Sequence, residues 1–286
     1  MKALAIVGLI VLMSVCAALA YAADIKMAFL TERDKFDDTD RFEYEWADKN
    51  FDTTLLRVKN GKFMDEGGKS RNLKDFAVIW WHKADEAKIP EAFLDNTVKN
   101  AILDYVKSGG AAFFSQVAFH YPFDLGLESQ EPRITGPNVD GGPNGFMPAE
   151  GQINHPIFKG FKKADLEKGI LHNTYGHDCM SDFYPNGGKD REVIGHAWQE
   201  PKPGWFGQVN PLSQYHHGDG LIFISGWRET VLRNQGKYYD RMTLLHENII
   251  NYLADESAFA RVDAGMKIAT TWGNVKREAH RTVLSD

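Results

Sequence analysis

The chain has 286 residues, of which 43% are hydrophobic and 25% are charged, so its composition is that of a globular protein and excludes a disordered chain. The net charge is -6 and the pI is near 5.9. No stripe of basic residues stands out, which argues against nucleic acid as a partner.

The first 22 residues predict an export signal. Lys2 supplies a positive charge, residues 3–15 are apolar, and Ala20-Tyr21-Ala22 matches a small-x-small cleavage site. We therefore expect a signal peptide at 1–22 and a secreted or periplasmic mature protein. The alternative is an uncleaved anchor, because the apolar run is long enough to span a bilayer, and only then do we expect membrane association. Cleavage would leave Cys179 as a lone cysteine, so no internal disulfide is expected.

Predicted strands and helices then alternate along the chain. Apolar or β-branched runs predict strands at 25–31, 53–58, 75–81, 111–115, 192–198 and 221–227. Helical spacing of apolar residues predicts helices at 39–50, 91–107 and 240–254, and the stripe of the second is Leu94, Val98, Ala101, Ile102 and Tyr105. Strand, helix and strand with short connections indicate an α/β fold, with a mostly parallel sheet and helices on both faces.

Two stretches lack this pattern. Residues 131–151 are rich in Gly and Pro without a period, and we expect a long loop there. Residues 255–286 are expected to form a C-terminal tail.

Four segments, taken in order, resemble the class I glutamine amidotransferase-like superfamily, and more narrowly its ThuA-like, trehalose-utilisation branch. They are "DYVKSGGAAFFS", "HPIFKGF", "GLIFISGW" and "HENIINYLA". The resemblance extends over residues 25–254 and implies a flavodoxin-like doubly wound sheet in one domain, which we place at 23–254. It implies no particular reaction, because that fold supports many activities.

The resemblance also allows a test for amidotransferase chemistry. Such enzymes carry a cysteine in a G-x-C-x-G turn and a histidine in a His-Pro-Glu sequence after a late strand. Here Phe113-Phe114-Ser115-Gln116-Val117 corresponds to the turn, and Ser225-Gly226 stand where the His and Pro would be. Without the cysteine, the glycines and the base, we expect Ser115 to end a strand and amidotransferase activity to be absent.

Strand ends supply the candidate ligand-binding residues, because ligands of doubly wound sheets bind beyond the carboxyl ends of the strands. His82, Ser115 and Trp227 each follow a predicted strand, and His120 lies shortly after Ser115. His155 opens "HPIFKGF", which by resemblance borders the site. The alternatives are core packing for Trp227 and a simple turn at His155, whose conformation Pro156 restricts.

Two further groups of histidines lie near acidic residues, as metal ligands often do. His172 lies near His177-Asp178, and His216-His217 lie near Asp219. Neither spacing is diagnostic of a metal site, so we predict no metal and no cofactor.

Three functions are compatible with these observations. The first is binding or processing of a carbohydrate-related small molecule, since aromatic side chains suit sugar rings. The second is a hydrolase that uses a metal or Ser115. The third is a non-enzymatic protein-interaction module that uses residues 131–151 and the tail.

Overall fold

The computed structural model describes residues 25–36, 38–83, 88–135, 144–173, 180–182, 190–199, 212–226 and 239–261. The predicted signal peptide, Trp227, His177 and most of the tail lie outside these residues.

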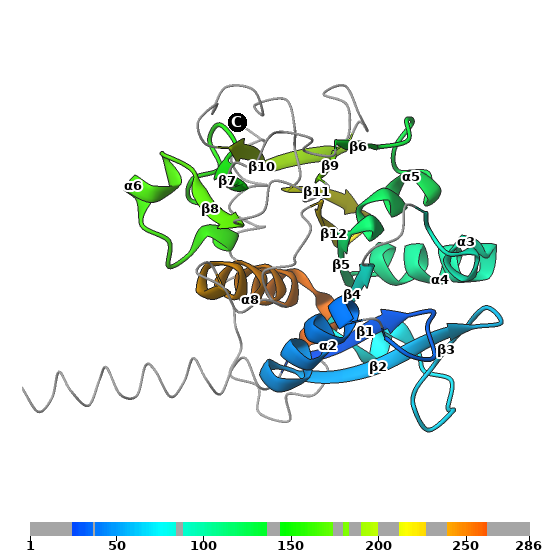
Figure 1. Ribbon diagram of the computed structural model, residues 1–286. Helices are drawn as coiled ribbons and strands as arrows, with labels where there is room; N and C mark the ends of the chain where they lie inside the picture. The colour runs from blue at the N-terminus through cyan, green and yellow to red at the C-terminus, as the bar shows by residue number, and fades with distance from the viewer. Residues whose placement is uncertain are drawn as a thin grey trace, which may run out of the picture.

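A ten-stranded sheet in the order β3-β2-β1-β4-β5-β12-β11-β10-β7-β8 forms the centre of the fold (Figure 1). Five neighbouring strands are parallel: β2 (Asp52–Lys59), β1 (Lys26–Thr31), β4 (Val78–Lys83), β5 (Ala111–Gln116) and β12 (Gly220–Ser225). The others pair antiparallel: β3 (Lys62–Met64), β11 (Leu212–His217), β10 (Arg191–Gln199), β7 (Asn144–Pro148) and β8 (Ile170–Asn173). The α/β class is therefore confirmed, whereas the expectation of a mostly parallel sheet is wrong, because the sheet is mixed.

The change of direction occurs at the hairpin that joins β11 to β12. The two strands pair from Leu212 with Ser225 to His217 with Gly220, which leaves a two-residue turn. Gly218 in this turn has φ +62°, a conformation that glycine adopts without a steric penalty. So short a connection can join only antiparallel strands, whereas parallel neighbours need a crossover.

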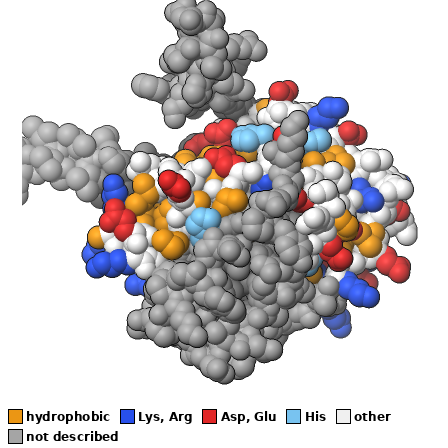
Figure 2. Space-filling view, turned by 90° about the horizontal axis from the view of Figure 1, so that it is seen from above, with side chains coloured by type: hydrophobic (Ala, Val, Ile, Leu, Met, Phe, Trp, Pro, Cys, Tyr) orange, Lys and Arg blue, Asp and Glu red, His pale blue; other side chains and the backbone are white. Residues whose placement is uncertain are grey.

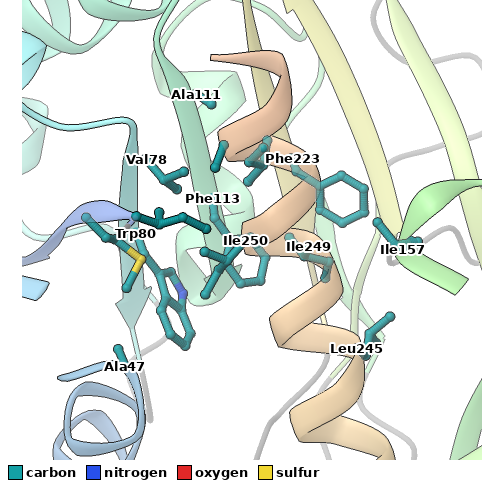
Figure 3. Packing of buried hydrophobic residues seen from close by; sticks show 14 of the residues in the cluster. Ala47, Val78, Trp80, Ala111, Phe113, Ile157, Phe223, Leu245, Ile249 and Ile250 are labelled. Atoms are coloured by element: carbon teal, nitrogen blue, oxygen red, sulfur yellow. The ribbon is translucent and has the colours of Figure 1, made fainter. Parts of the chain in front are cut away.

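Helices cover both faces of the parallel strands (Figure 1). On one face, α2 (Asp38–Asn50) and α8 (Tyr239–Glu256) pack on residues such as Phe29, Trp80 and Phe113. On the other, α3 (Glu91–Leu94) and α4 (Asn96–Lys107) pack on the intervening strand positions, because successive side chains of a strand point to opposite faces. Figure 3 shows the first of these layers, with Trp80 and Phe113 facing Ile249 and Ile250 of α8.

The predicted helix at 91–107 is divided in two at Asp95. The backbone of Asp95 (φ −57°, ψ 128°) is not helical, and its side chain accepts a hydrogen bond from the Thr97 N–H at 2.7 Å, which caps the start of α4. Val98, Ile102 and Tyr105 are buried as the stripe predicts. Leu94 precedes the break and is 38% exposed, so the prediction that it belongs to the buried stripe is wrong.

Residues 131–151, expected to be a loop, contain two strands. β7 pairs with β10 and β8 in the main sheet, and β6 (Arg133–Thr135) pairs with β9 (Met180–Asp182) in a separate two-stranded sheet. These short strands were not predicted because the Gly and Pro content of the segment is typical of a loop. The remaining elements are η1 (Leu73–Asp75), η2 (Val117–His120), α5 (Tyr121–Asp124), η3 (Pro156–Phe158), α6 (Lys163–Leu166) and η4 (Ala258–Arg261).

A buried tyrosine ties the starts of two parallel strands together. The Tyr105 hydroxyl lies 2.9 Å from the carbonyl oxygen of Ala77 and 3.1 Å from that of Ala111. Its ring lies directly on Gly110, where a Cβ atom would be only 2.4 Å from Tyr105 Cζ. Gly110 is therefore required here for close approach.

A buried ion pair joins the antiparallel strands to the connection after α5. Arg191 Nε lies 3.6 Å from Glu128 Oε1, and the Tyr215 hydroxyl donates to the same oxygen at 2.7 Å. The side chains of Glu128 and Arg191 are 0% and 3% exposed, so both charges are removed from water. Such a pair is stable only when its hydrogen bonds are made, and Tyr215 supplies one of them.

The surface of the described residues mixes side-chain types. On the face in Figure 2, acidic and basic side chains are interspersed with hydrophobic ones. None of the helices in the described part of the chain combines the length and the apolar character needed to span a bilayer.

Candidate functional site

Polar side chains replace apolar ones where the parallel strands end. In the strand register, His82 of β4 lies beside Ser115 of β5, and Ser115 lies beside Ser225 of β12. One position further on, Lys83 lies beside Gln116. The carboxyl ends of neighbouring parallel strands meet at one edge of the sheet, so these residues form one cluster, which we call the strand-end cluster.

The structure brings two of the predicted site residues, His82 and Ser115, into direct contact. His82 Nδ1 lies 2.8 Å from Ser115 Oγ, and the Trp80 Nε1–H donates to the same hydroxyl oxygen at 2.9 Å. The second ring nitrogen of His82 lies 4.0 Å from Asp40 Oδ1 on α2. A serine, a histidine and an aspartate thus follow one another through the cluster.

This arrangement has the residue types of a serine hydrolase but not its exposure. Ser115 is fully buried and sits in a regular strand that is paired on both sides. A hydroxyl has one hydrogen and two lone pairs, and Trp80 and His82 engage it from two directions. Ser115 therefore positions Trp80 and His82. Its buried hydroxyl is not accessible to a substrate that it could attack.

A chain of charges surrounds the ends of β1 and β4. Lys83 Nζ lies 2.7 Å from Glu32 Oε1, and Arg33 approaches both Glu32 (3.5 Å) and Asp40 (3.7 Å). Lys83 is only 1% exposed. A buried ammonium group is tolerated only when it is paired, so Glu32 fixes the position of Lys83 at this edge.

The sharp turn after β5 falls at Gln116 and not at Ser115. Gln116 has φ 58° and ψ −123°, a strained conformation for a residue with a side chain, whereas Ser115 is an ordinary strand residue. Counted from Gln116, the G-x-C-x-G positions are Phe114 and Ala118, and the small Ala118 was the signal that could have placed the turn correctly. Gln116 was not among the candidate residues predicted from the sequence.

The Gln116 side chain is buried without a complete set of partners. The residue is 5% exposed, and its Oε1 atom accepts no hydrogen bond from the described part of the protein. An acceptor in this state costs free energy unless a water molecule or a ligand satisfies it.

His120 ends η2, which follows β5 directly and packs on β4, β5 and β12. It is 8% exposed, and burial lowers its pKa from 6.5 to about 4. His120 is therefore a neutral imidazole at neutral pH and near the strand-end cluster.

His155 lies apart from the other candidates. Its Nδ1 accepts a hydrogen bond from the Ile157 N–H at 3.4 Å, and its ring packs on Tyr252 of α8 at 4.7 Å. Tyr252 therefore marks the position of His155 along α8. His246, which packs on Trp80 below the strand-end cluster, precedes Tyr252 by six residues, or about 9 Å along the helix axis. Burial lowers the pKa of His155, although Glu192 and Gln214 oppose this shift.

The remaining candidates lie outside the described residues or away from the strand-end cluster. Trp227 lies outside the described residues. Within the described ranges, no three His, Cys, Asp or Glu side chains converge so that they could hold a metal ion. His216, His217 and Asp219 lie on the β11–β12 hairpin.

Comparisons with known proteins place the fold coarsely. No protein-family model and no curated protein matches the chain. A ThuA-like protein from Bacteroides uniformis is similar in structure, with a TM-score of 0.52 and 12% identity over 83% of this chain and 94% of that one. PurLQS from Thermotoga maritima has a TM-score of 0.51 and 11% identity over 80% of this chain and 99% of that one.

A β-galactosidase from Bacillus circulans sp. alkalophilus has a TM-score of 0.50 and 9% identity over 82% of this chain, but the match covers only 31% of that enzyme. At these identities the similarity concerns the fold alone. The chain therefore has the coarse α/β fold of ThuA-like and class I glutamine amidotransferase-like proteins.

Proposed function

We propose that this protein is an exported, ThuA-like domain that binds a carbohydrate-related small molecule at the strand-end cluster and has no amidotransferase activity. The observation that carries the proposal is the identity of the residue at the sharp turn after β5. Gln116 holds the strained position, and an amide side chain is not a nucleophile. Neither cysteine of the chain, Cys16 or Cys179, occupies this position of the sequence.

The retained strain supports a role in binding. A residue with a side chain in this conformation costs roughly 1–3 kcal/mol and persists only where the surroundings impose it. Glycine would relieve the strain, yet the turn carries a buried amide instead. In related enzymes such a strained turn presents a catalytic nucleophile. Because Gln116 is not a nucleophile, we infer that the turn presents its amide to a ligand.

The position of the cluster in the sheet supports the same proposal. The five parallel strands follow the order β2-β1-β4-β5-β12, which is the flavodoxin-like order, and we infer a doubly wound arrangement. In such sheets ligands bind where the strand order reverses, here between β1 and β4. Glu32, His82 and Lys83 stand at that point.

The chemistry of the cluster suits a ligand rich in hydroxyl groups. It combines the acceptor oxygen of Gln116 with the partly exposed carboxylate of Glu32, whose charge Lys83 balances, and hydroxyl groups both donate and accept. The hydrolase alternative that uses Ser115 is disfavoured by the complete burial of this residue. The interaction-module alternative predicts that no small molecule binds at the strand ends.

A thermal-shift screen of the purified protein tests the proposal. The panel contains glucose, mannose, trehalose and myo-inositol, with glutamine as the comparison ligand, and a glutaminase assay runs in parallel. A sugar present at 100 times its Kd should stabilise the protein by about 2.7 kcal/mol. Hydrolysis of glutamine, or a panel without any shift, would contradict the proposal.

A further inference from the structure

We propose that the side-chain amide of Gln116 is the specificity-determining group of the site, and that it binds two neighbouring hydroxyl groups of an uncharged polyol. This inference rests on the proposed function and adds the group that selects the ligand. Gln116 occupies the turn at which an amidotransferase has its cysteine. The proposed role therefore depends on a residue that those enzymes do not have at this position.

The first step is the unsatisfied acceptor. Gln116 Oε1 is buried and accepts no hydrogen bond from the described residues, although the residue is 95% removed from solvent. Buried polar atoms in native proteins almost always have a partner. A hydroxyl group of a ligand could donate the missing hydrogen bond to this oxygen.

The second step is the fixed position of the amide. β5 is paired with β4 up to Lys83 and Gln116, and the preceding residue, Ser115, is held by Trp80 and His82. The end of β5 is therefore held by β4 up to Gln116 and by β12 up to Ser115, so the amide is carried on a fixed strand end. A preorganised group loses little entropy when a ligand binds.

The third step is the match between an amide and a diol. A glutamine amide presents an acceptor oxygen and a donor nitrogen side by side in one plane. Two neighbouring hydroxyl groups can donate to the first and accept from the second. A carboxylate or phosphate ligand could accept from the nitrogen, but it has no hydrogen to satisfy the oxygen.

A second buried glutamine provides a matched control. Gln214 of β11 is 3% exposed, but its amide is fully engaged: its nitrogen donates to Glu192 at 2.7 Å and its oxygen accepts from the Tyr252 hydroxyl at 3.0 Å. The two glutamines are equally buried and differ in whether the amide has partners. Methionine has nearly the same size as glutamine and no strong hydrogen-bonding group.

The experiment compares Gln116→Met with Gln214→Met, first without a ligand. Gln116→Met removes a buried acceptor that has no partner, so we expect the Tm to rise by about 2–4 °C. Gln214→Met removes one of the two glutamine donors to Glu192 and the acceptor of the Tyr252 hydroxyl, so its Tm should fall. A fall in Tm for Gln116→Met would overturn the inference, because the amide would then be satisfied within the protein.

Ligand binding is then measured by calorimetry with each sugar of the panel and its monodeoxy analogues. Gln116→Met should weaken binding about 5- to 150-fold, since two neutral hydrogen bonds are lost. Removing one hydroxyl of the recognised pair should weaken binding to the parent but not to the variant. Gln116→Gly, which relieves the backbone strain and also lacks the amide, should lose affinity in the same way and provides the comparison if the methionine variant folds poorly.

The outcomes separate this inference from the proposed function. If a sugar binds the parent and Gln116→Met equally well, the role of Gln116 is wrong and the proposed function stands. If no sugar binds the parent, the proposed function fails and the polyol assignment fails with it. If phosphorylated sugars bind more tightly than the uncharged ones, and this preference is lost in Gln116→Met, the amide recognises an anion and the diol assignment is overturned.

Discussion

Gly110 shows how a single missing side chain permits a tertiary contact. The Tyr105 ring occupies the space in which a Cβ atom at position 110 would stand, and its hydroxyl bonds to the carbonyl of Ala77 at the start of the neighbouring strand. The helix α4, the turn after it and two strands therefore meet at one residue pair.

Gly110→Ala should strongly destabilise the protein. The added methyl group would lie 2.4 Å from Tyr105 Cζ, so a fully buried ring must move, and overpacking of this kind costs about 1–3 kcal/mol or more. Urea unfolding measures the loss. Gly126→Ala is the control, because its added Cβ has no atom within 4 Å and the change costs only the backbone strain of its φ of +76°. Equal losses in the two variants would contradict the steric explanation.

Ser115→Ala should reduce the free energy of unfolding by about 1–3 kcal/mol. The change leaves the indole N–H of Trp80 and a ring nitrogen of His82 without a partner in a buried place. Denaturant unfolding provides the measurement. If Ser115 only positions these side chains, sugar affinity should change much less than stability, whereas an abolished hydrolytic activity would restore the hydrolase alternative.

At the scale of single elements, the short helix η2 introduces a pH dependence. Burial lowers the pKa of His120 to about 4 from its ordinary value of 6.5. Between these values the unfolded chain binds more protons than the folded protein, so stability must fall as the pH falls. The full loss, reached below pH 4, is about 3 kcal/mol.

His120→Gln removes this titration. The parent should lose about 3 kcal/mol more than the variant when the pH is lowered from 7 to 4, as measured by urea unfolding at both values. His155, whose pKa is also lowered, is present in both proteins, so the difference isolates His120. Parallel pH profiles for parent and variant would show that His120 is not buried in the folded protein.

The elements also show how far the sequence could predict this structure. The strands at 25–31, 53–58, 75–81, 111–115, 192–198 and 221–227 were predicted from apolar or β-branched runs, and each of them overlaps a strand of the main sheet. β7 and β8 were missed, since neither has such a run. The break at Asp95 was missed because the apolar spacing continues through it, although its capping side chain ends one helix and begins the next.

The strand-end cluster was predicted in part for a similar reason. Periodicity locates the end of a strand, and so His82 and Ser115 were found. It gives no backbone angle, and the turn was placed one residue early as a result. The unsatisfied amide of Gln116 depends on what surrounds it in three dimensions, which no sequence pattern contains.

At the scale of the whole molecule, a buried ion pair connects the antiparallel strands to the connection that leaves the parallel half. Glu128 follows α5, while Arg191 and Tyr215 belong to β10 and β11. Because both side chains are buried, removal of one takes from the other a charged partner that water does not readily replace.

Glu128→Gln should therefore lower the free energy of unfolding by about 1.5–3 kcal/mol, because Arg191 and the Tyr215 hydroxyl both lose a buried charged acceptor. The control is Asp34→Asn, which breaks an exposed pair with Lys59, and no measurable change in stability is expected there. Thermal unfolding of both variants measures the difference. If Glu128→Gln proves as stable as Asp34→Asn, the pair at Glu128 is not isolated from water.

Export concerns the whole chain as well. When the protein is expressed with its own leader, the mature form should begin at or near Ala23, because residues 20–22 match a cleavage site. Intact mass spectrometry of the secreted or periplasmic fraction measures this. A full-length mass in the membrane fraction would instead indicate that residues 1–22 remain as an anchor.

The hairpin of β11 and β12 also has a consequence for the order in which the chain folds. β12 pairs with β11 across a two-residue turn, but its other neighbour, β5, lies more than a hundred positions away in the sequence. A hairpin forms within about 1–10 μs, whereas contacts between distant segments must first overcome the entropy of closing a long loop. The hairpin should thus be assembled before it reaches β5, and the junction of β5 with β12, which places Ser225 beside Ser115, should be among the last parts of the sheet to close.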